Sequence, residues 1–172
     1  MKRLLPAFLL LAPAAVVAGP YDQPWAVIGS DASLTAEPKL RPVIVSRVDI
    51  DGAQMVFIAA HAMNPLRGGS RDSELGRMRG LIEEQAAAGL PVVLAGDLNT
   101  NAFEPAFWSL SSGLVDVDAG ATWGPDVDGP AILRIDHILT TPDLAPRDAA
   151  VDCDASASDH CLLEAVIGLP AA

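Results

Sequence analysis

Four short segments of the sequence carry the side chains best suited to chemistry. They read Ala-His-Ala-Met-Asn-Pro at 60–65, Ala-Gly-Asp-Leu-Asn-Thr at 95–100, Arg-Ile-Asp-His-Ile-Leu at 134–139 and Ser-Asp-His-Cys at 158–161. A histidine transfers protons near neutral pH, and a carboxylate beside it fixes its tautomer and stabilises its charged form. Carboxylate oxygens also bind hard divalent cations. The segments therefore hold side chains for acid–base chemistry, with or without a metal ion.

Each segment by itself also has an ordinary structural explanation. The stretch 97–99 suits an Asx turn, and His61 suits a hydrogen-bonded position at a strand edge. The Ser-Asp pair at 158–159 could cap a turn. Asp136 differs because it stands inside an apolar stretch, where a carboxylate needs a partner or a metal. Only the whole set, in this order along the chain, argues for a function.

The helices and strands that carry these segments are predicted to form an α/β fold. We expect strands at 42–50, 54–61, 91–96, 132–140, 148–152 and 161–167, and helices at 71–88 and 103–110. Asp51-Gly52 separates the first two strands, and both residues tolerate the positive φ of a tight hairpin. The run 55–60 is apolar without alternation, which indicates a strand covered on both faces. The polar segments lie at or just beyond strand ends, where α/β proteins commonly build their sites.

The expected helix at 71–88 has a recognisable apolar stripe and end. Gly89 suits the position after the helix, and Pro91 prevents continuation. The stripe consists of Leu75, Met78, Ile82 and Ala86. Three glutamates of the same segment are expected on its solvated face, namely Glu74, Glu83 and Glu84.

The order of the four segments resembles the endonuclease/exonuclease/phosphatase superfamily, the DNase I-like metal-dependent phosphoesterases. The similarity extends to the flanking stretches 49–65, 90–100 and 113–123, and covers residues 41–168. It implies a partial DNase I-like α/β sandwich, with mixed, largely antiparallel sheets flanked by helices. The expected domain is therefore 41–168, followed by a short tail at 169–172.

The resemblance also implies a role for each residue of the set. His160, held by Asp136, would act at the scissile phosphate as a base or as a charge stabiliser. Asp97 would orient or deprotonate the attacking water, or protonate the leaving oxygen. Asn99 would bind a phosphate oxygen and orient Asp97, and His61 would donate a hydrogen bond to the phosphate.

The same resemblance implies a divalent cation, Mg²⁺ or Mn²⁺, with Asp159 as a ligand. The family usually begins with a strand carrying an asparagine and a strand ending in Gln-Glu, whose glutamate is the principal metal ligand. Neither segment precedes residue 41, and Glu37 lies in a different context, so it receives no metal role. The metal site and part of one sheet are therefore expected to be incomplete. A second copy, a partner chain or the N-terminal arm could cover the exposed strands.

The composition narrows the classes of function. Acidic residues number 22 against 11 basic ones, for a net charge of −11, and 51% of residues are hydrophobic. This apolar content excludes a disordered acidic tail. Because the sequence has no basic cluster, high-affinity binding to duplex nucleic acid is not expected. A nucleic acid, a phospholipid head group or a small phosphate ester all stay open as substrates.

The N-terminus has the features of an export signal. Lys2 and Arg3 precede an apolar stretch at 4–11 and a small-residue stretch that ends at Ala18, which predicts a signal peptide cleaved after residue 18. An uncleaved membrane anchor is the alternative. Residues 19–40 are expected to form a linker or irregular arm. The mature chain would be periplasmic or extracellular.

Three functions follow from these observations. The first is a secreted, metal-dependent phosphoesterase that hydrolyses phosphodiesters or phosphomonoesters. The second is a catalytically impaired or truncated relative that serves as a binding or structural module. The third is an exported domain without enzymatic activity, stapled by Cys153 and Cys161; an oxidising compartment permits this disulfide, but two separate thiols stay open.

Overall fold

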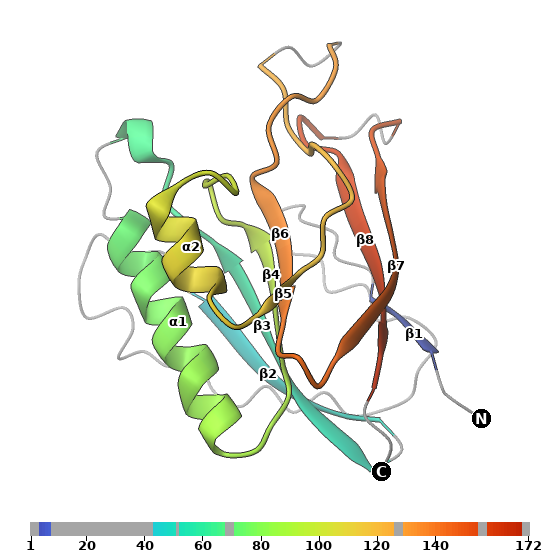
Figure 1. Cartoon of the computed structure of the whole chain (residues 1–172). Coiled ribbons are helices and arrows are strands. Elements are labelled where there is room, and N and C mark those ends of the chain that lie inside the picture. Colours follow the sequence, from blue (N-terminus) through green and yellow to red (C-terminus); the bar gives the residue numbers. More distant parts are fainter. Residues whose placement is uncertain are drawn as a thin grey trace.

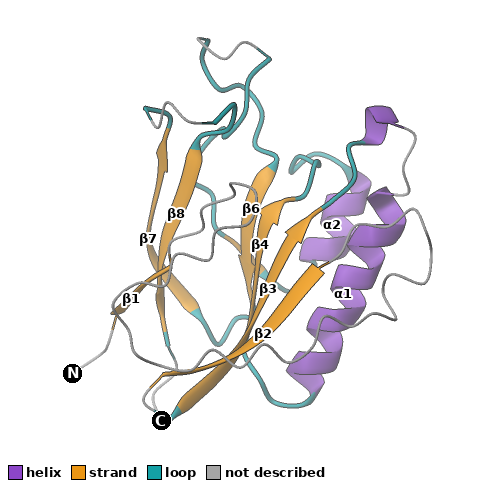
Figure 2. Cartoon of the chain, turned by 180° about the vertical axis from the view of Figure 1, so that it is seen from behind, coloured by secondary structure: helices purple, strands orange, loops and turns teal. Residues whose placement is uncertain are grey.

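The computed structural model of the chain describes residues 4–7, 43–50, 52–67, 71–125, 129–154 and 158–169. A five-stranded sheet and a three-stranded sheet face one another, and helices cover the other face of the larger sheet (Figure 1). The view from behind shows the same three layers (Figure 2). The expected α/β sandwich is thus the observed architecture.

The larger sheet has the strand order β2-β3-β4-β6-β5. Its strands are β2 (Val43–Ile50), β3 (Ala53–His61), β4 (Val92–Asp97), β6 (Asp136–Thr140) and β5 (Val115–Asp116). β2 and β3 form the expected antiparallel hairpin, in which the Gly52 N–H donates to Asp49 Oδ1 over 2.9 Å. Gly52 has φ of +87°, as a tight turn requires, while Asp51 lies outside the described residues. β4 runs parallel to β3 and antiparallel to β6.

The smaller sheet has the order β1-β8-β7, and both of its pairings are antiparallel. Its strands are β1 (Leu4–Ala7), β8 (Leu162–Gly168) and β7 (Ala145–Asp152). β1 falls within the expected signal peptide, where the structure describes no other residue. The arm at 19–40 and the tail from 170 onwards also lie outside the described residues. The signal peptide and the arm therefore stay predictions.

Two helices and a short 3-10 turn complete the described elements. They are α1 (Arg71–Ala87), α2 (Pro105–Ser111) and η2 (Pro65–Arg67). In the described part of the chain, no helix has the length and apolar character that crossing a membrane requires. The end of α1 confirms the sequence pattern, because Gly89 follows with φ of +78°, a conformation that favours glycine.

Two expectations about α1 were wrong. Ala86 is exposed, because the buried stripe ends one turn earlier with Leu75, Met78 and Ile82. Glu74 is buried instead of solvated, and its carboxylate accepts the Met63 N–H over 2.6 Å. A carboxylate in the first helical turn is also favoured by the positive end of the helix dipole. Glu74 therefore ties the start of α1 to the loop that follows β3.

Some strand boundaries also differ from the sequence pattern. β6 begins at Asp136 rather than at 132, because the backbone N–H groups of Ile132 and Leu133 donate to the Trp123 carbonyl instead. β7 begins at Ala145 rather than at 148. The later start of β6 makes a carboxylate, not an apolar residue, the first residue of a central strand.

The apolar side chains form one cluster on each face of the larger sheet. The cluster under the helices includes Ile58 of β3, Leu94 of β4 and Leu75 of α1. The cluster between the sheets includes Val93 of β4 and Leu163 of β8. All residues of β4 are buried, as expected for a strand covered on both faces. The central strands are thereby fixed firmly enough to position polar groups at their ends.

Leu94 is fully buried, so Leu94→Asp should destabilise the chain severely. The substitution removes apolar contacts and leaves an unpaired charge in the core, which costs more than about 4 kcal/mol. Leu66→Asp is the matched control, because Leu66 is 93% exposed and its replacement should change stability by less than about 0.5 kcal/mol. Urea denaturation of both variants measures the difference. Equal stability would contradict the placement of β4.

Candidate active site

Three polar side chains stand side by side at one end of the larger sheet. His61 is the last residue of β3, Asp97 the last of β4 and Asp136 the first of β6. The strand register pairs His61 with Asp97 and Asp97 with Asp136. Paired residues on neighbouring strands point to the same face of a sheet. Residues far apart in the sequence therefore form one row.

Asp97 occupies the centre of this row. Its Oδ2 lies 3.2 Å from His61 Nε2 and accepts Asn99 Nδ2–H over 3.1 Å. Its Oδ1 accepts the Asn99 backbone N–H over 2.9 Å. The same Asn99 amide group donates to the Ala62 carbonyl over 2.9 Å. Asn99 adopts φ of +48°, a conformation that asparagine tolerates better than most residues. The expected Asx turn is thus present, and it orients the carboxylate.

The pKa of Asp97 is raised above the ordinary value for an aspartate. Burial is the main cause, and the nearby negative charge of Asp136 adds to it. The Asn99 N–H and the two histidines His61 and His160 act in the opposite direction. Asp97 is therefore a better proton acceptor than an exposed aspartate.

His160 and Asp136 form the second hydrogen-bonded pair of the site. His160 Nδ1–H donates to Asp136 Oδ2 over 2.8 Å. The same oxygen accepts the hydroxyl of Thr122 over 2.6 Å, and Thr122 is fully buried. The buried Asp136 therefore has the partner that its apolar surroundings require. Thr122 was not identified from the sequence as a site residue, because it was counted only in the flanking stretch 113–123 of the resemblance.

The pKa of His160 is raised above the ordinary histidine value. The hydrogen bond to Asp136 is the main cause; burial opposes it, and the charges of Asp97 and Asp159 add to it. The folded protein therefore favours the imidazolium form of His160 more than an exposed histidine would. Asp159 precedes His160 in the sequence and is exposed.

A glycine immediately before Asp97 makes the close approach of β3 and β4 possible. Gly96 has φ of +148°, and a Cβ atom there would lie 1.8 Å from the carbonyl oxygen of Ala60. No side chain fits in this space. The glycine of the Gly-Asp-x-Asn segment therefore has a structural role, because it lets Asp97 reach the position opposite His61.

A second polar network, formed by His137, Arg134 and Asp116, lies next to the site and supports it. His137 is fully buried and its Nε2–H donates to the Thr100 carbonyl over 2.8 Å, which holds the end of the Gly-Asp-x-Asn loop. Arg134 binds both oxygens of Asp116, at 2.8 and 2.5 Å. Burial alone would raise the pKa of Asp116, but the hydrogen bonds from Arg134 and the proximity of His137, whose Nδ1 lies 3.7 Å from Asp116 Oδ1, lower it to about 2. These contacts give His137 and Arg134 supporting positions that their motif alone did not reveal.

The structure also bears on the expected metal ion. Within the described residues, no three or more His, Cys, Asp or Glu side chains gather in a way that could hold one. Mg²⁺ usually takes one or two carboxylates together with waters and substrate phosphates. Asp159 supplies one exposed carboxylate, and Glu37 lies outside the described residues. A Mg²⁺ ion held by Asp159 would therefore need water and substrate phosphate oxygens to complete its coordination.

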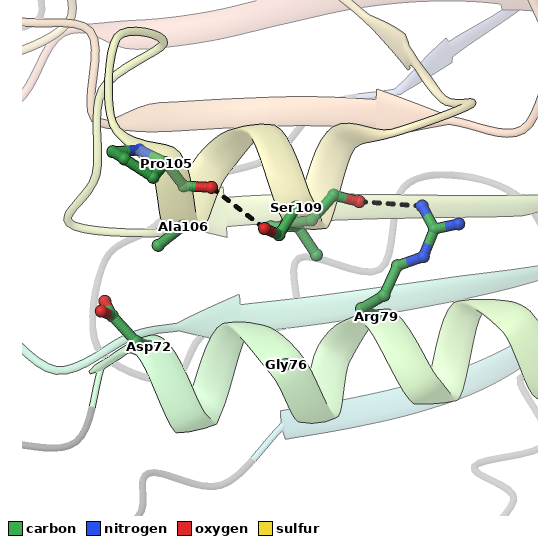
Figure 3. A pocket seen from close by; sticks show the side chains of 7 residues that line it. Asp72, Gly76, Arg79, Pro105, Ala106 and Ser109 are labelled. Carbon is green, nitrogen blue, oxygen red and sulfur yellow. Dashed lines mark hydrogen bonds between the residues drawn. The ribbon is translucent and has the colours of Figure 1, made fainter.

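A hollow of about 350 Å³ lies elsewhere, between the two helices (Figure 3). One side is formed by Asp72, Gly76 and Arg79, and the other by Pro105, Ala106, Ser109 and Leu110. Arg79 Nη1–H donates to the Leu110 carbonyl over 3.1 Å at one end of it. No residue of the polar row lines this hollow, so it is separate from the candidate active site.

Gly96→Ala should weaken the fold, because the added methyl group would overlap the Ala60 carbonyl. We expect a loss of more than about 2 kcal/mol, as for other forced overlaps in packed regions. Gly76→Ala is the matched control, since Gly76 is exposed and a Cβ atom there meets nothing within 4 Å. Alanine at that helical position should stabilise the chain by up to about 1 kcal/mol. Thermal denaturation of both variants measures the difference in stability. A Gly96→Ala protein as stable as the wild type would contradict the close approach of β3 and β4.

The His160–Asp136 pair should make stability depend on pH. Because folding raises the pKa of His160, the pair stabilises the protein fully below about pH 6.5 and loses its effect as pH rises through the folded-state pKa. His160→Gln should therefore destabilise the chain more at pH 6 than at pH 9, by about 1 to 2 kcal/mol. Urea denaturation at both pH values measures this. An equal loss at the two pH values would contradict the charged pair.

A family comparison agrees with the resemblance that the four polar segments indicate. The chain matches the Endonuclease/Exonuclease/phosphatase family over residues 10–160, a range that begins inside the expected signal peptide. No curated protein sequence matches the chain. The resemblance on which the site residues were identified is thus confirmed at the level of the family.

Solved structures share the fold at low sequence identity. An endonuclease/exonuclease/phosphatase family protein from Bacteroides thetaiotaomicron is 18% identical, with a TM-score of 0.63, over 76% of this chain and 56% of that one. The mannosyl-6-phosphatase of Bacteroides thetaiotaomicron VPI-5482 is 19% identical, with a TM-score of 0.64, over 83% and 63%. Truncated Caenorhabditis elegans TDP2 is 18% identical, with a TM-score of 0.61, over 74% and 60%.

The chain covers less than two thirds of the length of each of these three structures. The structure brings together His61, Asp97, Asn99, Asp136 and His160, and their roles in catalysis stay predictions. The chain belongs to the Endonuclease/Exonuclease/phosphatase family.

Proposed function

We propose that the chain hydrolyses phosphate esters by attack of a water molecule on phosphorus. One observation carries the proposal: in the row His61, Asp97 and Asp136 at one end of the larger sheet, Asp97 lies 3.2 Å from His61 and Asp136 holds His160 by a hydrogen bond. Family membership supports hydrolase chemistry of this class. The low identity of the solved relatives leaves the substrate to experiment.

Asp97 is proposed as the group that takes the proton from the attacking water. Its raised pKa brings its basicity closer to neutral pH, where a general base works best. Water oxygen forms the new bond to phosphorus, the bond to the leaving oxygen breaks, and the water proton moves to the Asp97 carboxylate. The leaving oxygen takes a proton from the solvent or from a neighbouring acid.

His160 is proposed to stabilise the charge that develops on the phosphoryl oxygens. The raised pKa of its imidazole favours the cationic form, and Asp136 holds the Nδ1 side so that Nε2–H is directed away from the pair. His61 would donate a hydrogen bond from the opposite end of the row. In this proposal both histidines act on the substrate and Asp136 acts through His160.

Asn99 is proposed as a positioning residue. An amide group has two N–H donors, and those of Asn99 go to Asp97 and to the Ala62 carbonyl. The orientation of Asp97 is thus supported, whereas a donated hydrogen bond from Asn99 to phosphate would require one of these bonds to break.

Metal dependence and export complete the proposal. Arg71 and Arg134 are both engaged by carboxylates, in contacts to Glu104 and Asp116, so they add little positive charge for an anionic substrate. A Mg²⁺ or Mn²⁺ ion, for which Asp159 is the one expected ligand, would supply that charge when bound. The Cys153–Cys161 disulfide suits a periplasmic or extracellular location, in agreement with the expected signal peptide.

The substrate class is proposed from phosphate chemistry alone. One fold relative is named a mannosyl-6-phosphatase, which makes a phosphomonoester the first substrate type to examine. A phosphodiester, from a nucleic acid or a phospholipid head group, is the second. The net charge of −11 argues against tight binding to duplex nucleic acid in either case.

The decisive experiment is hydrolysis of p-nitrophenyl phosphate and bis-p-nitrophenyl phosphate by the purified mature chain, with Mg²⁺, with Mn²⁺ and with EDTA. We expect metal-dependent turnover that falls at least about 100-fold in Asp97→Asn, as for loss of a general base, and in His160→Ala, as for loss of a donor that stabilises developing charge. Asp148→Asn on the exposed face of β7 is the matched control and should retain full activity.

Retained activity in His160→Ala or in Asp97→Asn would overturn the proposed roles. No turnover of either ester, or of nucleic-acid and phospholipid substrates, by a folded wild-type chain would instead favour a binding or structural module. Turnover that EDTA leaves unchanged would remove the metal ion from the proposal and keep the hydrolytic site.

A further inference from the structure

The disulfide lies directly beside the candidate active site. Cys153 follows the last residue of β7, and Cys161 stands between His160 and the first residue of β8. The two Cα atoms are 4.2 Å apart. The bridge therefore closes the loop that carries His160, on the side nearest to that residue.

Backbone contacts show how the bridge could control His160. The Cys161 N–H donates to the Thr122 carbonyl over 2.7 Å, and the His160 N–H donates to Ser158 Oγ over 3.0 Å. Thr122 also holds Asp136 through its hydroxyl. The segment Thr122–Trp123 thus pairs with the backbone of residues 160 and 161 while it fixes the carboxylate that His160 contacts. A shift of Cys161 would move His160 relative to Asp136.

The position of the bridge limits its effect to this loop. β7 and β8 already pair from Ala145–Gly168 to Asp152–Leu162, so the strands do not need the bridge to stay together. Neither cysteine belongs to the two apolar clusters. Because the closed loop is short, the bridge also constrains the unfolded chain less than a long-range disulfide does.

We propose that the Cys153–Cys161 disulfide is a positioning device for His160, so that the candidate active site is assembled in the oxidised chain and loosened in the reduced one. This inference rests on the proposed function for its effect on hydrolysis. Its effect on the geometry of His160 does not depend on that function. Cys153 is exposed, which gives a dithiol access to the bridge.

The redox step is an ordinary exchange. A dithiol such as dithiothreitol reduces the bridge by two electrons, so that the S–S bond breaks and two cysteine thiols form. The dithiol loses two hydrogens and closes to its own disulfide. Reoxidation reverses the step and should restore the original position of the loop.

The experiment compares the oxidised wild type, the wild type reduced with dithiothreitol, and Cys153→Ser/Cys161→Ser. The chain has only three histidines, so the imidazole N–H signals can be resolved by NMR and assigned with His160→Gln. We expect the downfield Nδ1–H signal of His160 in the oxidised protein and its loss or shift in the other two forms. Circular dichroism should show an unchanged fold in all three.

Hydrolysis is measured on the same samples. We expect a fall in kcat of tenfold or more on reduction, with KM changed less than twofold, and recovery after reoxidation. Dithiothreitol should have no effect on the double serine variant, which controls for other actions of the reagent. Alkylation and intact mass confirm the state of the thiols.

An unchanged His160 signal together with an unchanged kcat in the fully reduced chain would overturn the inference. Loss of the whole fold on reduction would also overturn it, since the bridge would then support the domain and not the loop. If the oxidised chain hydrolyses nothing, the proposed function fails, and the NMR signal still decides whether the bridge positions His160.

Discussion

The hydrogen bond between His160 and Asp136 joins the two layers of the sandwich at the candidate site. Asp136 begins β6 of the larger sheet, and His160 leads into β8 of the smaller one. The bond is therefore only as well defined as the packing between the sheets, where Ile138 and Leu163 share one apolar cluster. Apolar burial is not directional, but close packing of the two sheets fixes the position of His160 and so orients its imidazole towards Asp136.

The closeness of two buried carboxylates at the site works against the stability of the fold. Asp97 and Asp136 are buried on adjacent strands, where burial and mutual repulsion both oppose ionisation of Asp97. Asn99, His61 and His160 offset part of this cost. Such groups are expected where chemistry requires a tuned pKa, and less often where a protein needs only stability. The row is thus better explained by function than by folding.

Neighbouring residues hold the side chains of the row in fixed positions. Gly96 brings β4 close to β3, the Asn99 turn orients Asp97, and Thr122 fixes Asp136. His137 holds the next turn from the buried side. Each of these contacts uses a short or rigid group, so little conformational freedom remains in the side chains that would meet a substrate.

Much of this arrangement could be predicted from the sequence because its signals are local. The Asp51-Gly52 hairpin, the helix end at Gly89 and the buried run of β4 each depend on neighbouring residues. The order of the four polar segments identified the family, which the comparison confirms. The residue types of the site, and the strands that carry them, were thus determined by sequence alone.

The remaining features arise from contacts between residues distant in the chain. Glu74 is buried because the loop after β3 offers it an N–H, and Thr122 matters because Asp136 lies within reach of its hydroxyl. Helical and strand patterns describe only which side a residue faces, not what is packed there. Tertiary structure therefore decided that Glu74 is buried, that His61 meets Asp97 and that the two cysteines lie close enough to bond, since strand register and sheet packing set those distances.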